Sequence, residues 1–241
     1  MSRTRALAAV VVVLGVAAAS GLGCGAAKPS LSFNASAGNP VVVYKTFQAI
    51  APVYNPTVPQ VVVYGDGTVI KKEDAYKLTT GMASVPDLLK DLSEDGFFGL
   101  KQDYQGKPLP GGVTATMIVN LEDKSYKVTV APNSAPSNWH AVVGVVKGVK
   151  TTGSKEYVPE KVRLFANAEG EAQPGNVVPW PGGAQELETA AAAKNGVVLA
   201  GDAAGTAWKA IAKEGVDVSW QAGGKVYTYV YALPLLPGIQ D

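Results

Sequence analysis

The chain is poor in histidine and cysteine, two side chains that often act as a general base, a nucleophile or a metal ligand. Among its 241 residues there is one cysteine, Cys24, and one histidine, His140. A catalytic triad needs a histidine beside a nucleophile and an orienting carboxylate, and the sequence around His140 supplies neither, so we expect this residue at the surface or at a helix cap. One histidine and one cysteine are too few for the usual zinc sites, and no P-loop or dinucleotide-binding motif appears. We expect neither a metal nor another cofactor.

Acidic side chains are the remaining catalytic candidates, because a glycoside hydrolase needs only two carboxyl groups. The candidates by residue type fall at predicted turns or helix caps, where acidic side chains commonly bind the backbone. A surface hydrolase that uses two of them is therefore an alternative to a protein without catalytic activity, which we favour. The candidates are Asp66, Asp103, Glu122, Asp123 and Asp202.

Three tyrosines near the end of the chain are the candidates for a binding surface. Tyr227, Tyr229 and Tyr231 occupy every second position of a predicted strand, so they should project from one side of it. If that side is exposed, it is a flat amphipathic platform for a glycan or a partner protein. If a helix covers it, the tyrosines belong to the core, because tyrosine is also a favoured strand residue. Both alternatives remain open.

The residues before Cys24 have the pattern of an export signal. Arg3 and Arg5 precede an uncharged, Ala- and Val-rich run at residues 6–19 that ends in small side chains. A basic start and an apolar run shorter than about 20 residues are typical of a secretory signal and not of a membrane-spanning helix. Cys24 would then enter an oxidising compartment without a second cysteine, and a lone thiol there needs a reason to be present.

Gly23-Cys24-Gly25 at the end of this run resembles the signal of bacterial lipoproteins. The resemblance implies that the Cys24 thiol receives a diacylglycerol, often with a further acyl chain such as palmitate, and that a peptidase cuts just before Cys24. Gly21 stands where that family usually has leucine. The alternative is an ordinary cut after residues 17–19, which leaves Cys24 as a free thiol. We expect an exported protein, lipid-anchored to the bacterial cell membrane or outer membrane.

The charge balance argues against nucleic acid as a partner. The chain has 21 Lys and Arg against 20 Asp and Glu, and removing Arg3 and Arg5 with the signal leaves 19 against 20. Arg163 is then the only arginine, whereas nucleic-acid binders concentrate Lys and Arg on one surface. With a single cysteine the chain forms no internal disulfide, so packing alone must stabilise the fold.

Hairpins in series, with helices between them, predict an α+β fold of mostly antiparallel sheet with about four helices. Turn signals between apolar runs lie at Asp66-Gly67, where a type I′ turn fits, at residues 122–124 and at Gly223-Gly224. Capping residues and apolar positions at helical spacing predict the helices. These are expected from Ser84 to Gly96, from Ser137 through Val146, from Ala184 to Gly196 and from Asp202 to Lys213.

Composition divides the chain into a signal, a linker and a folded region. The residues after the signal are rich in Gly, Ala, Ser and Asn, which predicts a flexible tether. A polar stretch at 148–160 marks a boundary between two possible lobes. The expected parts are a signal peptide at 1–23, a tether at 24–40 and a globular α+β region at 41–241, with lobes at 41–150 and 157–241.

Three motifs resemble a family of uncharacterised secreted or lipid-anchored bacterial proteins. They are the YGDGT hairpin at Tyr64 to Thr68, the helix from Asp87 that ends in Phe97-Phe98, and the segment from Trp220 to Pro237. The resemblance implies an envelope location and a shared fold, and no reaction. We therefore expect a membrane-tethered, non-catalytic protein that binds an envelope partner protein, a wall polymer or a small ligand.

Overall fold

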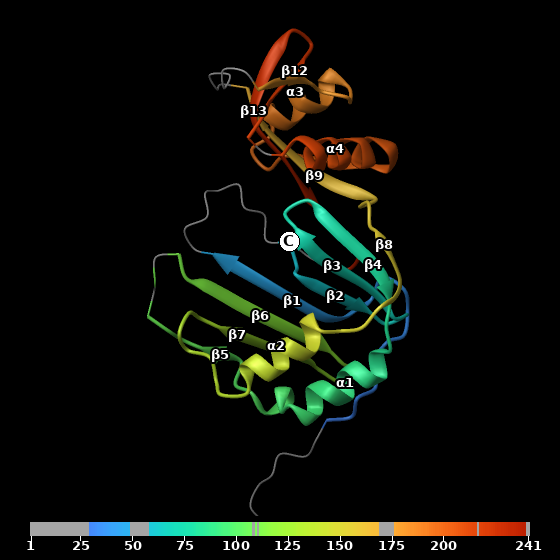
Figure 1. Ribbon diagram of the computed structural model, residues 1–241, viewed down its shortest axis with the longest axis vertical. Coiled ribbons are helices and arrows are strands. Elements are labelled where there is room, and N and C mark those ends of the chain that lie inside the picture. Colours follow the sequence, from blue (N-terminus) through green and yellow to red (C-terminus); the bar gives the residue numbers. More distant parts are fainter. Residues whose placement is uncertain are drawn as a thin grey trace, which may run out of the picture.

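The computed structural model describes residues 29–48, 58–107, 109, 111–168, 176–215 and 217–239. In this part of the chain, four α-helices and thirteen strands form an α+β fold with two mostly antiparallel sheets (Figure 1). The signal sequence and Cys24 lie outside the described residues. None of the described helices has the length and apolar character needed to cross a membrane.

The larger sheet has eight described strands in the order β5-β7-β6-β1-β2-β3-β4-β8. Its β2–β3 and β6–β7 pairs are two of the hairpins that the sequence predicted. All neighbours in this sheet are antiparallel except the short β5–β7 pair. The strands are β1 (Pro40–Gln48), β2 (Val61–Tyr64), β3 (Thr68–Asp74), β4 (Lys77–Met82), β5 (Asp103–Tyr104), β6 (Val113–Asn120), β7 (Ser125–Val130) and β8 (Thr152–Glu156).

Two helices, α1 (Val85–Glu94) and α2 (Trp139–Lys147), cover one face of the large sheet (Figure 1). Helix α1 begins as predicted, because the Ser84 side chain accepts a hydrogen bond from the Asp87 amide, and Gly96 follows its end with a positive φ of 78°. The helical interpretation of the valine-rich α2 is confirmed. Its N-cap is Asn138 and not the expected Ser137. The side-chain Nδ2 of Asn138 donates to the Asp95 carbonyl, which ties the two helices together.

The Ser84 cap allows a direct test of this interpretation. The change Ser84→Ala removes the acceptor for the Asp87 amide and should lower the free energy of unfolding by about 1 kcal/mol. The matched control is Ser93→Ala in the same helix, where alanine is the better helix former and stability should be unchanged or slightly higher. Urea denaturation of both variants gives the two values, and equal values would contradict the capping role.

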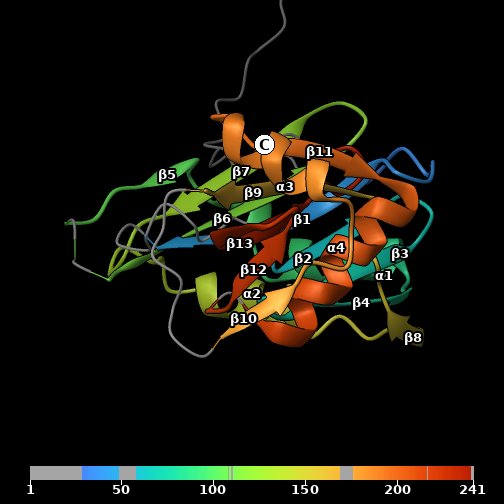
Figure 2. The same ribbon diagram turned by 90° about the horizontal axis from the view of Figure 1, so that it is seen from above.

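The smaller sheet has five described strands in the order β10-β12-β13-β9-β11 and carries α3 (Ala184–Ala192) and α4 (Gly201–Glu214). It lies at the opposite end of the molecule from α1 and α2, and Figure 2 shows it stacked above the large sheet. Gly223 and Gly224, with φ of 56° and 78°, make the two-residue turn of the predicted third hairpin. The strands are β9 (Lys161–Asn167), β10 (Val177–Pro179), β11 (Val197–Ala200), β12 (Ser219–Ala222) and β13 (Lys225–Pro234).

The two sheets share a hydrophobic core. One buried cluster contains Val62 and Leu78 of the large sheet together with Leu164 of the small sheet and Trp208 of α4. Tyr76, in the β3–β4 turn, meets Trp208 edge to face with ring centroids 5.4 Å apart. The chain passes from the large sheet to the small sheet within the polar stretch at 148–160, after β8, which pairs with β4 of the large sheet. We expect the two sheets to unfold together.

Tyr64 is a member of this shared core with an unpaired polar group. It is 2% exposed, and its hydroxyl has no hydrogen-bond partner among the described residues. An unpaired buried hydroxyl costs about 1–3 kcal/mol, so Tyr64→Phe should raise the free energy of unfolding, by about 1 kcal/mol after losses in packing. The partly buried Tyr126 is the matched control, because no buried unpaired hydroxyl is lost in Tyr126→Phe. Lower stability of Tyr64→Phe in thermal denaturation would contradict this account.

The same variant should change how stability depends on alkaline pH. Burial, with smaller contributions from Tyr157 and Asp66, raises the pKa of Tyr64 above its ordinary value. The folded protein then keeps a proton that the unfolded chain loses above about pH 10, so stability falls as pH rises beyond that value. Tyr64→Phe removes this contribution, and its stability should decline less steeply above pH 10 than that of the unmodified protein.

The segment at 29–39 packs against the large sheet, although the sequence predicted a flexible tether over 24–40. Leu31 and Phe33 contact the core beneath α1 and α2. The Glu122 amide donates to the Ser32 carbonyl at 2.9 Å. The Asn34 carbonyl passes so close to Gly65 that any Cβ there would lie 1.9 Å from it, which glycine alone avoids. The prediction failed here because these contacts come from residues far away in the sequence.

The β2–β3 turn also differs in detail from the expected type I′ turn. The Gly67 amide donates to the Tyr64 carbonyl at 3.0 Å, and Gly67 has a φ of 88°. Asp66 accepts from the Thr68 amide at 2.9 Å. This is the pattern of a three-residue loop in which glycine occupies the left-handed position after a type I turn. The hairpin itself is confirmed.

Candidate functional site

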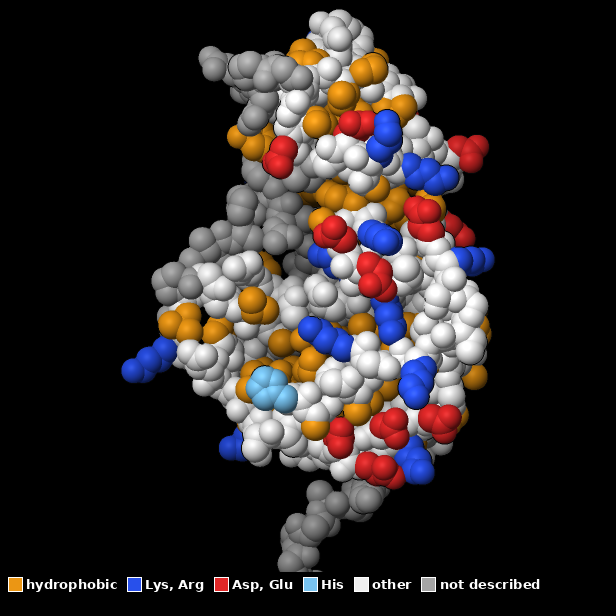
Figure 3. Space-filling model, viewed as in Figure 1, with side chains coloured by type: hydrophobic (Ala, Val, Ile, Leu, Met, Phe, Trp, Pro, Cys, Tyr) orange, Lys and Arg blue, Asp and Glu red, His pale blue; other side chains and the backbone are white. Residues whose placement is uncertain are grey.

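A groove of about 750 Å³ lies between the large sheet and helix α4, a volume typical of small-molecule sites. Its walls come from the β3–β4 turn, β4, the end of β8 and the second half of α4. Tyr76, Leu78 and Ile211 supply apolar surface. Figure 3 shows apolar side chains at the waist between the two parts of the molecule, with acidic and basic side chains around them.

Charged side chains of both signs surround the apolar surface of the groove. Lys77, Lys209 and Lys213 lie near the carboxylates described next, and Lys213 contacts Glu214 at 2.7 Å. The hydrogen bond to Glu214 raises the pKa of Lys213 above its ordinary value. Because the two signs balance, the groove suits a ligand with an apolar body and both donor and acceptor groups, and favours neither a pure anion nor a pure cation.

Three acidic residues line the groove: Asp74, Glu156 and Asp217. A general acid is usually held in apolar surroundings, whereas all three of these side chains are exposed. The described lining contains no histidine, cysteine or serine that could serve as a nucleophile or base. The chemistry of these walls therefore suits binding better than bond cleavage.

The acidic residues that the sequence singled out are not part of this groove. Asp66 holds the β2–β3 turn, and Asp103 accepts from Gln105 at the β5 edge. Asp202, the expected cap of α4, lies in its first turn, two residues beyond the observed N-cap, Ala200. Glu122 and Asp123 form the β6–β7 turn, where Glu122 borders a second hollow of about 540 Å³. The structure does not bring these candidates together in one cleft.

The three tyrosines of β13 do not form a shared exposed platform. Tyr227 is 1% exposed and lies opposite Trp220 in the shared core, and Tyr231 is 7% exposed and stacks on Phe165 with ring centroids 4.6 Å apart. Tyr229 alone is exposed, at 55%. The regular alternation fails because Tyr229 has a positive φ of 50° and the pairing register shifts between Thr228 and Tyr231. The core alternative therefore holds for Tyr227 and Tyr231.

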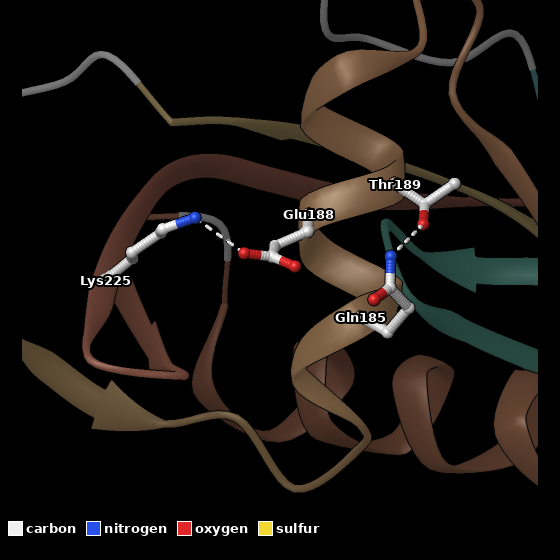
Figure 4. A network of polar contacts seen from close by, with 4 residues as sticks. All are labelled: Gln185, Glu188, Thr189 and Lys225. Atoms are coloured by element: carbon white, nitrogen blue, oxygen red, sulfur yellow. Dashed lines mark hydrogen bonds and ion pairs between the residues drawn. The ribbon is translucent and has the colours of Figure 1, made fainter.

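Polar contacts at the tip of the small sheet have a structural role. The Lys225 Nζ lies 2.6 Å from the Glu188 Oε1 and ties the β12–β13 hairpin to α3, while Gln185 donates to Thr189 within the helix (Figure 4). The hydrogen bond to Glu188 raises the pKa of Lys225. Both partners are largely exposed, so we expect this ion pair to add little to stability.

His140 lies on the exposed side of α2, away from the groove, as expected for a surface residue. Cys24 lies outside the described residues. Within the described part of the chain, no group of three or more His, Cys, Asp or Glu side chains is placed to hold a metal ion. Comparisons of the chain with protein-family models, curated proteins and solved structures found no match.

Proposed function

We propose that this chain is exported, is tethered to the bacterial envelope through a lipid on Cys24, and binds a partner protein, a wall polymer or a small ligand without catalysing a reaction. The N-terminal sequence supports export and the lipid tether. The observation that carries the binding role is the described lining of the groove, which combines apolar surface with exposed charges of both signs and contains no histidine, cysteine or serine. Apolar surface with a few polar groups is the usual composition of a binding site.

The lipid anchor follows from simple energetics. Each buried methylene group contributes about 0.8 kcal/mol, and one acyl chain binds a membrane only marginally. A diacylglyceryl thioether at Cys24 places two chains in the bilayer, so the protein stays bound. Its ligand must then be present at, or pass close to, the same envelope surface.

The binding role can be tested with a photoreactive amino acid in the groove. We would place p-benzoylphenylalanine at Lys77 and, as the matched control, at His140, which is exposed on the other side of the large sheet. Irradiation of intact cells should give a discrete cross-linked product from position 77 and none from position 140. Identical products from both positions, or none from either, would contradict a ligand site in the groove.

The alternative function is a hydrolase that uses two acidic residues. One observation favours it: Asp74, Glu156 and Asp217 line the same groove. The change Asp74→Asn combined with Glu156→Gln separates the two functions, because a hydrolase would lose activity toward envelope glycans by orders of magnitude. A non-catalytic protein shows no such activity before or after the change.

A further inference from the structure

We infer that the lipid on Cys24 holds one end of the large sheet close to the membrane and presents the groove to the aqueous side. The inference rests on the proposed lipid anchor and adds an orientation to it. The end in question consists of residues 29–39, the β2–β3 turn at 65–67 and the β6–β7 turn at 121–124, which we call the anchor rim. Its partner is the surface of the bilayer that carries the acyl chains.

The chain between the lipid and the fold has a short reach. Cys24 and Pro29, the first described residue, are separated by five residue steps. Fully extended, five steps span about 17 Å. The tether of 24–40 predicted from composition would have reached about 55 Å and left the body free to turn in any direction. The shorter link confines the start of the fold to a thin layer above the bilayer.

From residue 29 onward, the chain is bound to the anchor rim. The contacts of Ser32 with Glu122 and of Asn34 with Gly65 join it to both turns. The Gly65 amide also donates to the Asn39 carbonyl at 2.9 Å, at the start of β1. These contacts lie on two different hairpins, so a pull on residue 29 acts on the whole end of the sheet.

The groove lies at the opposite end of β3 from the anchor rim. Strand β3 begins at Thr68, beside the rim, and ends at Asp74, which lines the groove. Seven residues of strand cover about 20 Å. The described chain starts near the lower end of the molecule in Figure 1, beside α1, whereas helix α4, which forms the other wall of the groove, lies in the upper part. The groove is therefore held beyond the rim and on the side away from it.

Charge does not supply an alternative way to hold the rim on the membrane. The rim contains Asp66, Glu122 and Asp123 against one lysine, Lys124. Anionic lipids attract polybasic surfaces, so this rim has no electrostatic affinity for them. The acyl chains alone must keep it near the bilayer. A ligand of the groove then approaches from the aqueous side and not from within the lipid.

Energy transfer to labelled lipid tests this orientation. Acylated Cys24 has no free thiol, so Asp123→Cys on the rim and Lys194→Cys beyond α3 each introduce one labelling site at an exposed position. The lipidated, full-length protein carries a donor dye at one site, in vesicles whose headgroups carry an acceptor. We expect transfer from position 123 to exceed that from position 194 by about twofold or more.

A lengthened tether provides the matched control. Inserting a 20-residue Gly-Ser linker after Lys28 adds a root-mean-square reach of about 25 Å, which should lower transfer from position 123 and reduce the difference between the two sites. Equal transfer from both sites with the natural tether overturns the orientation while the anchor stands. Protein that does not bind the vesicles overturns the anchor, and the orientation with it.

Discussion

Changing Cys24 to serine is expected to move nearly all of the protein from the membrane fraction to the soluble fraction. A serine hydroxyl cannot form the thioether that carries the diacylglycerol, so the acyl chains and their contribution of about 0.8 kcal/mol per methylene are lost. Fractionation of the native host, with a carbonate wash of the membranes, measures the distribution.

The change Ser20→Ala serves as the control, because it alters a neighbouring small residue of the signal and leaves Cys24 in place. This variant should stay in the membrane fraction. An uncleaved signal could also hold the Cys24→Ser protein on the membrane, and the intact mass identifies that case by the retained residues 1–23. A fully cleaved Cys24→Ser protein that remains on washed membranes would show that the lipid is not the anchor.

The largest loss of stability is expected for Trp208→Ala. Trp208 is fully buried in α4, and its ring contacts Tyr76 of the large sheet. Removing a buried aromatic ring leaves a cavity and lowers the free energy of unfolding by about 3–5 kcal/mol. Since the core is shared, both sheets should lose stability together. Hydrogen exchange of amides in β1 and in β9 should accelerate in parallel.

Trp208→Phe is the matched variant, because it keeps an apolar ring. Its loss in the free energy of unfolding should be less than about half of the loss in Trp208→Ala. The measurement is chemical denaturation followed by hydrogen exchange at single residues. If the β9 amides lost protection in Trp208→Ala while the β1 amides kept theirs, the two sheets would be independent units. The account of a shared core would then be wrong.

The elements predicted correctly are those whose signals are local. Ser84 needs only the amide of Asp87, and Gly96 needs only its own positive φ, so helix α1 could be placed to within a residue. The turn at Gly223-Gly224 likewise depends on two adjacent residues. Hairpins in series with helices between them were sufficient to predict the α+β class.

The features that the sequence did not predict depend on contacts between distant residues. The bulge at Tyr229 moves Tyr231 onto Phe165 of another strand, and no local signal marks it. Residues 29–39 have the composition of a linker, yet they pack because Gly65 leaves room for the Asn34 carbonyl. The groove likewise combines Tyr76, Glu156 and Lys209 from three separate elements, so spacing along the chain could not reveal it.

The intact mass of the protein, purified with detergent from its own host, shows whether Cys24 carries a lipid. We expect the mass of residues 24–241 plus a diacylglyceryl group, with or without a further acyl chain, and partition into the detergent phase. A mass equal to the unmodified polypeptide of residues 20–241, in material that washes free of membranes without detergent, would contradict it.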